Sequence, residues 1–268
     1  MKRYFIPIIT VLTLFRPAAY ALDHPALQDS VAGGVQLRTG ADANFNFEHG
    51  GINISEELRF NLAPTPEMYL ANTTIGADVK IVKGYLNGHA GYMLRIRGNK
   101  FSTGDASKII RHRIFFGLNE HVKFGTQQQF TLSLRERAVL DMRFDEPNAY
   151  EKQAYAWEMR YRLHFQYKSF SLPLTPYIWS ELSHTCNATE YQKYYNNGHN
   201  YINAVKTAVG LKWKLNMRNT LNFYVRYDWK RDFDIDANKD GTTIKTAQQV
   251  IMNQAIIGIN YTFGWKKR

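Results

Sequence analysis

Residues 155–167 read Tyr-Ala-Trp-Glu-Met-Arg-Tyr-Arg-Leu-His-Phe-Gln-Tyr, and every second position of this stretch, beginning with Tyr155, is apolar or aromatic. Most of the positions between them carry Glu, Arg, His or Gln. Because successive side chains of a strand point to opposite sides of a sheet, the alternation predicts a strand with one apolar and one polar face. The stretch is about twice as long as an ordinary globular strand of ~5–6 residues, and a tilted strand of ~9–11 residues can cross a bilayer.

Ten further segments repeat this alternation, least clearly at 174–183, where Trp179 and Glu181 share a face. The ten segments are 35–47, 52–62, 71–81, 86–97, 110–118, 129–138, 174–183, 205–215, 221–229 and 254–265. The connections are short at 82–84, 168–173 and 216–219, and long at 98–108, 141–152, 184–200 and 231–249. Such a rhythm is typical of outer-membrane barrels, whose periplasmic turns are short and whose external loops are longer.

The distribution of charge distinguishes a membrane barrel from a soluble one. Arg or Lys occupies the polar face of nearly every segment, whereas the other face is apolar, with aromatic residues toward the strand ends. A water-soluble barrel or sandwich would have to bury all of these apolar faces. A membrane barrel does not need to bury them, because it turns its apolar faces toward lipid and its polar faces toward a lumen. The predicted fold class is therefore all-β, a transmembrane antiparallel β-barrel of 10–12 strands.

The number of strands is less directly encoded. Bacterial barrels made from one chain have an even number of strands, yet eleven segments show the pattern. If the C-terminus is periplasmic, every long connection lies outside the cell, but segment 35–47 then starts on the wrong side of the membrane. Either this segment does not span, which leaves ten strands, or a strand is hidden in 184–200 or 232–252. We predict twelve strands.

The N-terminal residues predict export. Lys2 and Arg3 precede an apolar stretch at 5–15, and Ala19-Tyr20-Ala21 resembles a signal-peptidase site. The predicted organisation is a signal peptide at 1–21, a periplasmic segment at 22–32, an outer-membrane barrel at 33–265 and a basic tail at 266–268. Removal of residues 1–21 takes away three basic residues and lowers the net charge from +11 to +8. An exported chain is not expected to meet nucleic acid, so the expected partners are outer-membrane lipid and lipopolysaccharide.

Several short motifs lie on the predicted strands. They are Glu57-Leu58-Arg59-Phe60, Arg111-His112-Arg113, Leu134-Arg135-Glu136-Arg137, the stretch 157–163 (WEMRYRL), Pro176-Tyr177 with Glu181, and Tyr227-Asp228-Trp229. Together they resemble an uncharacterised, domain-of-unknown-function family of Gram-negative outer-membrane β-barrel proteins, over roughly residues 33–265. The resemblance implies an outer-membrane barrel and carries over no catalytic residue. Phe263 resembles the aromatic C-terminal signal of such barrels, which implies the barrel-assembly machinery as a partner.

The polar faces predict a lumen rich in arginine. The residues expected to line it are Arg59, Arg95, Arg97, Arg111, Arg113, Arg135, Arg137, Arg160, Arg162, Lys212, Arg226, Glu57, Glu158 and Asp228. Rings of Arg and Lys select anions in pores, and the interior resembles that of twelve-stranded channels for acidic oligosaccharides. Alternatively, the arginines pair with the carboxylates and fill a closed, structural barrel. The sequence leaves both functions open, a structural barrel and one that passes small anionic solutes.

A third possibility is a membrane-embedded barrel enzyme acting on lipid or peptide at one rim. His89, His164, Ser133 and Ser180 are available on the strands, but no signature joins them. No cofactor or metal is expected. The single cysteine, Cys186, excludes a cysteine-rich metal site, and the calcium-loop-like segment 236–241 is followed by Ala247 where a ligating Glu belongs.

Overall fold

The computed structural model describes residues 25–62, 67–98, 109–143, 154–238 and 243–266, which form eleven strands and one short helix. The elements are β1 (Gln28–Asn46), β2 (Gly50–Asn61), β3 (Glu67–Val82), β4 (Leu86–Arg97), β5 (Ile109–Phe124), β6 (Phe130–Met142), β7 (Tyr155–Tyr167), β8 (Leu174–Thr185), α1 (Glu190–Tyr194), β9 (Ile202–Lys214), β10 (Asn219–Ala237) and β11 (Ile244–Lys266). The predicted signal peptide at 1–21 lies outside the described residues.

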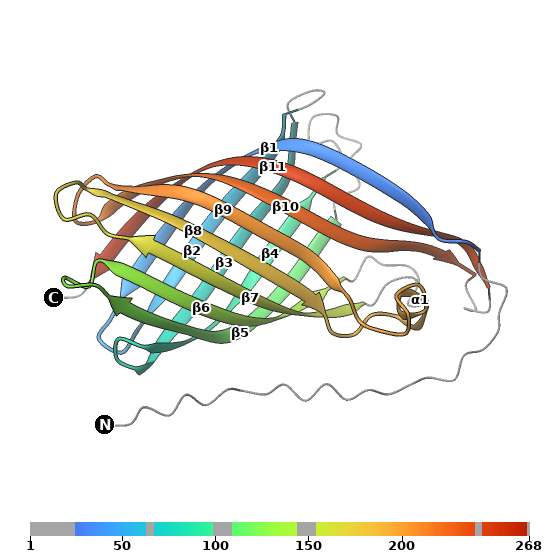
Figure 1. The fold of residues 1–268 in the computed structure, drawn as a ribbon, viewed down its shortest axis with the longest axis horizontal. Coiled ribbons are helices and arrows are strands. Elements are labelled where there is room, and N and C mark those ends of the chain that lie inside the picture. The colour runs from blue at the N-terminus through green and yellow to red at the C-terminus, as the bar shows by residue number, and fades with distance from the viewer. Residues whose placement is uncertain (1–24, 63–66, 99–108, 144–153, 239–242, 267–268) are drawn as a thin grey trace.

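The strands form a single closed barrel (Figure 1). Each strand pairs antiparallel with its neighbours in sequence, and β1 closes the barrel by pairing with β11 in parallel, from Gln28 opposite Gln248 to Asn46 opposite Lys266. The turns at one end, such as 47–49 and 83–85, are short, and this end is called the short-turn end. The opposite end carries the connections 98–108, 143–154 and 186–201 and is called the long-loop end.

The prediction of twelve strands is wrong, because the described part of the chain forms eleven. The two segments in which a further strand was expected have other structures. Segment 184–200 contains α1, which begins after the capping box formed by Thr189 and Gln192. Segment 232–252 continues β10 and β11, which pair with each other as far as Ala237 opposite Ile244. An odd number of strands still closes, because the first and last strands can pair in parallel.

A small apolar cluster covers part of the long-loop end, where β10 and β11 project beyond the β9–β10 pairing (Figure 1). Tyr201, Phe233 and Ile235 are buried in it, and the rings of Tyr201 and Phe233 meet edge to face with centroids 4.9 Å apart. The segment that contains α1 is also hydrogen-bonded to β10 beside this cluster, because Arg231 Nη2 donates to Asn196 Oδ1 at 2.8 Å. Among the described residues, no helix is long and apolar enough to cross a membrane.

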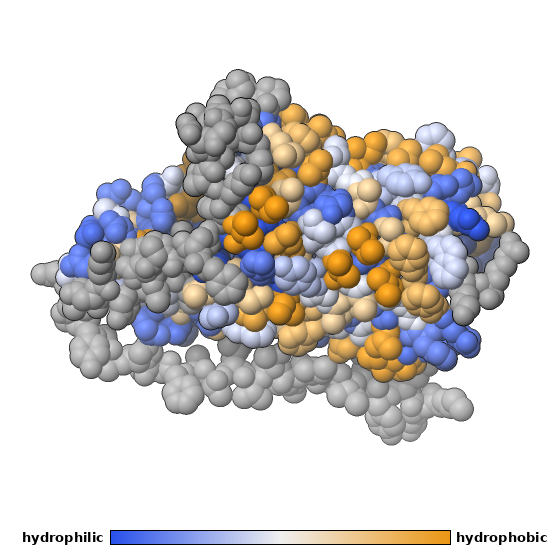
Figure 2. Space-filling model, turned by 180° about the vertical axis from the view of Figure 1, so that it is seen from behind, coloured by the Kyte–Doolittle hydropathy of each residue, from blue (hydrophilic) through white to orange (hydrophobic). Residues whose placement is uncertain are grey.

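The two faces of the strands have the predicted contrast. Apolar side chains such as Val225 and Ile257 point outward and are 57% and 52% exposed. Figure 2 shows hydrophobic residues spread over one outer face of the barrel, with hydrophilic ones among them. Neighbouring positions of opposite phase point inward, and Arg38 and Asp228 are fully buried there. The barrel is therefore inside out compared with a water-soluble protein, with apolar groups outside and charges within.

Three aromatic rings inside the barrel lie against glycines of the adjacent strand. Tyr224 lies opposite Gly258, and the pairs Tyr177–Gly210 and Phe115–Gly91 repeat the arrangement. A Cβ atom added at Gly258 would overlap the Tyr224 ring. A glycine leaves its backbone uncovered, and the ring of the neighbouring strand covers it.

Replacement of Gly258 by Ala is expected to lower the stability of the barrel by about 1–3 kcal/mol, because the Tyr224 ring must leave its place on the wall. Urea unfolding of the barrel in detergent, followed by tryptophan fluorescence, measures the change. Gly34→Ala is the matched control, since a Cβ at Gly34 has no atom within 4 Å. Equal losses in the two variants would contradict the steric explanation.

Candidate functional site

The interior of the barrel contains a cavity of about 750 Å³, room for about 25 waters at ~30 Å³ each. Its lining extends from Asn44 and Asn53 near the short-turn end to Gln192 and Tyr201 at the long-loop end. Within the described part of the chain, fourteen Arg or Lys and eight Asp or Glu residues line it. The candidate site is therefore an elongated cavity with an excess of positive charge.

Thirteen of the fourteen residues expected in the lumen line this cavity. They are Arg59, Arg95, Arg97, Arg111, Arg113, Arg135, Arg137, Arg160, Arg162, Arg226, Glu57, Glu158 and Asp228. The exception is Lys212, whose Nζ donates to Gln166 Oε1 at 3.3 Å and lies 5.1 Å from the centre of the Tyr177 ring. Lys212 thus belongs to the part of the interior nearer the short-turn end.

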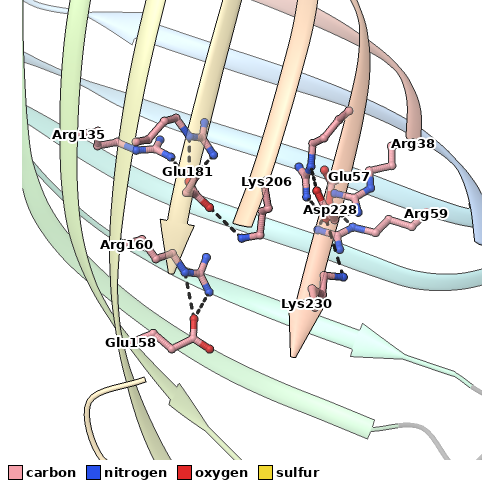
Figure 3. Close-up of polar contacts among 12 residues, drawn as sticks. Arg38, Glu57, Arg59, Arg135, Glu158, Arg160, Glu181, Lys206, Asp228 and Lys230 are labelled. Carbon is pink, nitrogen blue, oxygen red and sulfur yellow. Dashed lines mark hydrogen bonds and ion pairs between the residues drawn. The ribbon is translucent and has the colours of Figure 1, made fainter. Parts of the chain in front are cut away.

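Asp228 on β10 is the centre of one group of charges (Figure 3). Its two carboxylate oxygens accept two hydrogen bonds from Arg226, both of 2.5 Å. Arg38 Nη2 lies 3.4 Å from Oδ2, and the side chains of Arg38 and Asp228 are both fully buried. Lys230 Nζ lies 3.9 Å away. A buried carboxylate with three cations around it is electrostatically satisfied, and the fully buried Arg38 depends on it.

Glu181 on β8 is the centre of a second group, which lies beside the first with β9 between them (Figure 3). Arg162 and Arg135 approach Oε2 at 2.6 and 3.1 Å, and Lys206 Nζ approaches Oε1 at 2.8 Å. The three cations come from β7, β6 and β9, so one carboxylate joins three other strands. The Arg162 guanidinium also lies 4.1 Å from the centre of the Trp179 ring, which is a cation–π contact.

Three further carboxylates pair with arginines. Glu57 accepts from Arg59 Nε at 2.6 Å, Glu158 accepts from Arg160 Nη2 at 2.5 Å, and Asp141 pairs with Arg113. Arg113 and Asp228 were expected in the lumen, but Asp141 and Lys230, which contact them, were not. Asp141 and Lys230 continue the inward phase of Arg137 and of Asp228, so extending the alternation by one or two steps along each strand would have found both residues.

Four consecutive strands carry the same tripeptide pattern, an arginine on either side of one outward residue. The tripeptides are Arg95-Ile96-Arg97 on β4, Arg111-His112-Arg113 on β5, Arg135-Glu136-Arg137 on β6 and Arg160-Tyr161-Arg162 on β7. The register places arginines directly opposite each other in the pairs Arg95–Arg111, Arg135–Arg162 and Arg137–Arg160. Like charges directly opposite destabilise a sheet, so this wall of the lumen is not optimised for stability alone.

Within the described residues, two of these arginines have neutral groups as their closest partners. Arg95 Nε donates to Asn72 Oδ1 at 2.9 Å, and no carboxylate pairs with its guanidinium among the described residues. Arg137 Nε lies 3.1 Å from His89 Nε2, and its guanidinium lies 4.2 Å from the centre of the Phe115 ring. Both line the cavity, so part of its positive charge is not neutralised by a neighbouring carboxylate of the described chain.

The residues considered for catalysis are separated by the structure. Ser133 lies opposite His164 in the register of β6 and β7, but among the described residues no hydrogen bond joins the two side chains. Ser180 faces outward and shares a hydrogen bond of 3.2 Å with Thr207, and His89 contacts Arg137. Among the described residues there is no group of three or more His, Cys, Asp or Glu side chains that could hold a metal ion.

The fold and this interior define a class: closed β-barrels that are apolar toward their surroundings and charged within. The family model described as a protein of unknown function (DUF2490) matches residues 33–239, and the chain belongs to this family. The match confirms the resemblance to a family of unknown function that the strand motifs indicated. None of the curated proteins compared with this chain matches it.

Solved structures of outer-membrane proteins resemble the chain over most of its length. One is the NanC porin, with 13% identity and a TM-score of 0.40, covering 73% of this chain and 87% of the other. Another is in-vitro folded OmpT, an outer membrane protein of Vibrio cholerae, with 10% identity and a TM-score of 0.34, covering 79% and 90%.

Proposed function

We propose that the protein spans the bacterial outer membrane, with its long-loop end outside, and passes small anionic solutes through its lumen. The observation that carries this proposal is the cavity of about 750 Å³ whose lining contains fourteen basic and eight acidic residues of the described chain. An excess of Arg and Lys along a pore favours anions and disfavours cations.

The outer surface supports the membrane part of the proposal. Apolar side chains point outward in the middle of several strands, and four of them, Ile75, Phe116, Leu163 and Val209, are 52–53% exposed. A soluble monomer rarely exposes contiguous apolar surface of this extent, whereas lipid tails would cover it without cost. Aromatic rings gather near the short-turn end, where Phe124, Phe130 and Phe165 are in ring contact, as expected for a residue belt at a membrane interface.

The refolded protein in a planar bilayer is expected to conduct, with chloride more permeant than potassium. Arg137→Glu should lower the anion-to-cation permeability ratio severalfold, because it reverses a charge that lines the cavity and has no carboxylate partner among the described residues. The reversal potential in a KCl gradient measures the ratio.

Lys193→Glu is the control for this measurement. Lys193 lies on α1 and pairs with Glu190, and it does not line the cavity. Reversal of its charge should leave the permeability ratio close to that of the unchanged protein. A cation-selective channel, or one whose selectivity responds equally to both variants, would contradict the proposal.

A second candidate is a closed barrel with a structural role, and the ion pairs favour it. Glu181 and Asp228 each have three cationic neighbours within 4 Å, and the two groups lie on either side of β9 on one wall of the lumen, with Lys206 between them (Figure 3). On the wall of β8–β10, Tyr177, Trp179 and Tyr224 pack together and narrow the interior. A folded barrel that inserts into the bilayer without conducting would favour this second candidate over the channel.

A further inference from the structure

Toward the short-turn end, the inward cations of β5, β7 and β9 are lysines. They are Lys123 on β5, Lys168 directly after β7, and Lys212 and Lys214 on β9. Each lies an even number of positions from residues of the same segment that line the main cavity, so all four share the inward phase. None of the four forms an ion pair within the described part of the chain, where Lys212 Nζ donates to the neutral Gln166 amide.

A second, smaller cavity lies beside these lysines. Its volume is about 230 Å³, room for about eight waters at ~30 Å³ each. Its lining includes Lys123, Thr131, Gln166, Lys168 and Phe170, and none of its lining residues lines the main cavity. Lys123 lies opposite Thr131, and Thr131 lies opposite Gln166. One row across β5, β6 and β7 therefore presents an ammonium group, a hydroxyl and an amide to the same small cavity.

The polar groups of this small cavity can still bind a ligand. The Lys123 ammonium and the Thr131 hydroxyl form no hydrogen bond within the described residues. Gln166 uses Oε1 to accept from Lys212, which leaves its amide nitrogen as a donor. Lys168 Nζ lies 5.7 Å from the centre of the Phe170 ring, a cation–π contact that leaves the ammonium hydrogens open to an acceptor.

The chemistry of the lining indicates a class of solute. Two ammonium groups without a counter-charge in the described chain favour an anion, and a hydrated lysine head group binds a carboxylate as a point charge. The Thr131 hydroxyl donates and accepts, and the Gln166 amide nitrogen donates, which matches hydroxyl groups on the solute. The Phe170 ring adds an apolar surface against which CH groups can pack.

We propose that this small cavity binds a small hydroxycarboxylate at the short-turn end of the lumen. The inference rests on the proposed function, to which it adds a solute class and a second position along the path. The carboxylate lies between Lys123 and Lys168, and the hydroxyl groups meet Thr131 and Gln166. Both lysines are exposed and hold the anion weakly, as conduction requires of a site from which the solute must also leave.

Gluconate and propionate are the probes, because each carries one negative charge and only gluconate carries hydroxyl groups. Saturation-transfer NMR of the refolded barrel in detergent measures both dissociation constants without any current, at low ionic strength because salt screens exposed charges. Gluconate should bind severalfold more tightly than propionate. Lys123→Gln should weaken both about threefold, the size of one exposed charge pair. Thr131→Val should weaken gluconate alone, by about fivefold, the size of one hydrogen bond.

Lys83→Gln is the matched control, because it removes an exposed cation from the turn at 83–85, at the same end but outside the small cavity. Heat-modifiable gel mobility shows that each variant is folded. Equal weakening by Lys83→Gln and Lys123→Gln would overturn the site, since net charge would then suffice. Equal affinities for gluconate and propionate would overturn it as well, because the hydroxyl groups would then make no contact.

Current through a planar bilayer separates this site from the proposed function. A barrel that binds gluconate in the expected order of variants, but does not conduct, would support the site and contradict the channel. A barrel that conducts chloride, but binds no gluconate, would overturn the site and leave the channel.

Discussion

Replacement of Asp228 by Ala is expected to lower the stability of the barrel by roughly 3–5 kcal/mol, the largest effect of any single substitution considered. The side chains of Asp228 and Arg38 are both fully buried, and the carboxylate also accepts two hydrogen bonds from Arg226. Removal of one member of a buried ion pair leaves the other as an uncompensated charge. Arg226 is partly exposed to the cavity and can turn toward water, whereas Arg38 has no such freedom. Urea unfolding of the barrel in detergent measures the loss.

Two variants separate this explanation from a general sensitivity to lumen charge. Asp78→Asn removes another carboxylate of the cavity lining, one that takes part in no ion pair within the described chain, and it should cost far less. The double variant Asp228→Ala with Arg38→Met should recover most of the loss, because an apolar residue in place of the buried cation needs no counter-charge. A double variant as unstable as Asp228→Ala would show that the Arg38 charge is not the cause.

The start of β1 is expected to be accessible to a reagent outside the cell. The turn at 83–85 is expected to be accessible only from the other side of the membrane. β1 runs parallel to β11, so Gln28 lies at the long-loop end. In a Cys186→Ser background, a large polymer-linked maleimide should label Gln28→Cys on intact cells. Lys83→Cys should be labelled only after the cells are permeabilised. Both positions are exposed in the folded chain, so the effect is close to all or none.

The unchanged protein supplies the orientation control for this experiment, because Cys186 is exposed in the connection between β8 and β9 at the long-loop end. It should be labelled on intact cells. If Cys186 reacts on intact cells but Gln28→Cys and Lys83→Cys both need permeabilisation, β1 does not cross as it does in this structure. Ten strands or twelve would then describe the barrel in the membrane better than eleven.

The register of side chains could be predicted because it is a local property. In the stretch 155–167, a two-residue period is enough to place Arg160 and Arg162 on one face and Tyr161 on the other. The same reasoning placed thirteen of the fourteen expected lumen residues on the lining of one cavity. This reasoning missed Asp141 and Lys230, because the polar face continues to these residues beyond the predicted segments 129–138 and 221–229.

The partners of those side chains could not be predicted, because they depend on register between strands and on the tilt of the barrel. Glu181 meets Arg162 of the adjacent strand β7, but also Arg135 of β6, two strands away. In the sequence, Glu181 falls on the same face as Trp179, so the alternation in this segment is unclear. Nothing there indicated that three cations converge on the Glu181 carboxylate. The same holds for Arg38 and Asp228, which are 190 residues apart in the chain and on opposite sides of the β1–β11 junction.

The sequence by itself determined that this protein is a barrel of long strands with an apolar outside and an arginine-rich inside. The two-residue period, and which face carries the charges, can be read from each strand alone. Only the tertiary structure decided that eleven strands close with β1 parallel to β11, and that Glu181 and Asp228 neutralise some arginines while Arg95 and Arg137 keep neutral partners. Closure and pairing join residues up to about 220 positions apart, and no local pattern encodes contacts at that distance.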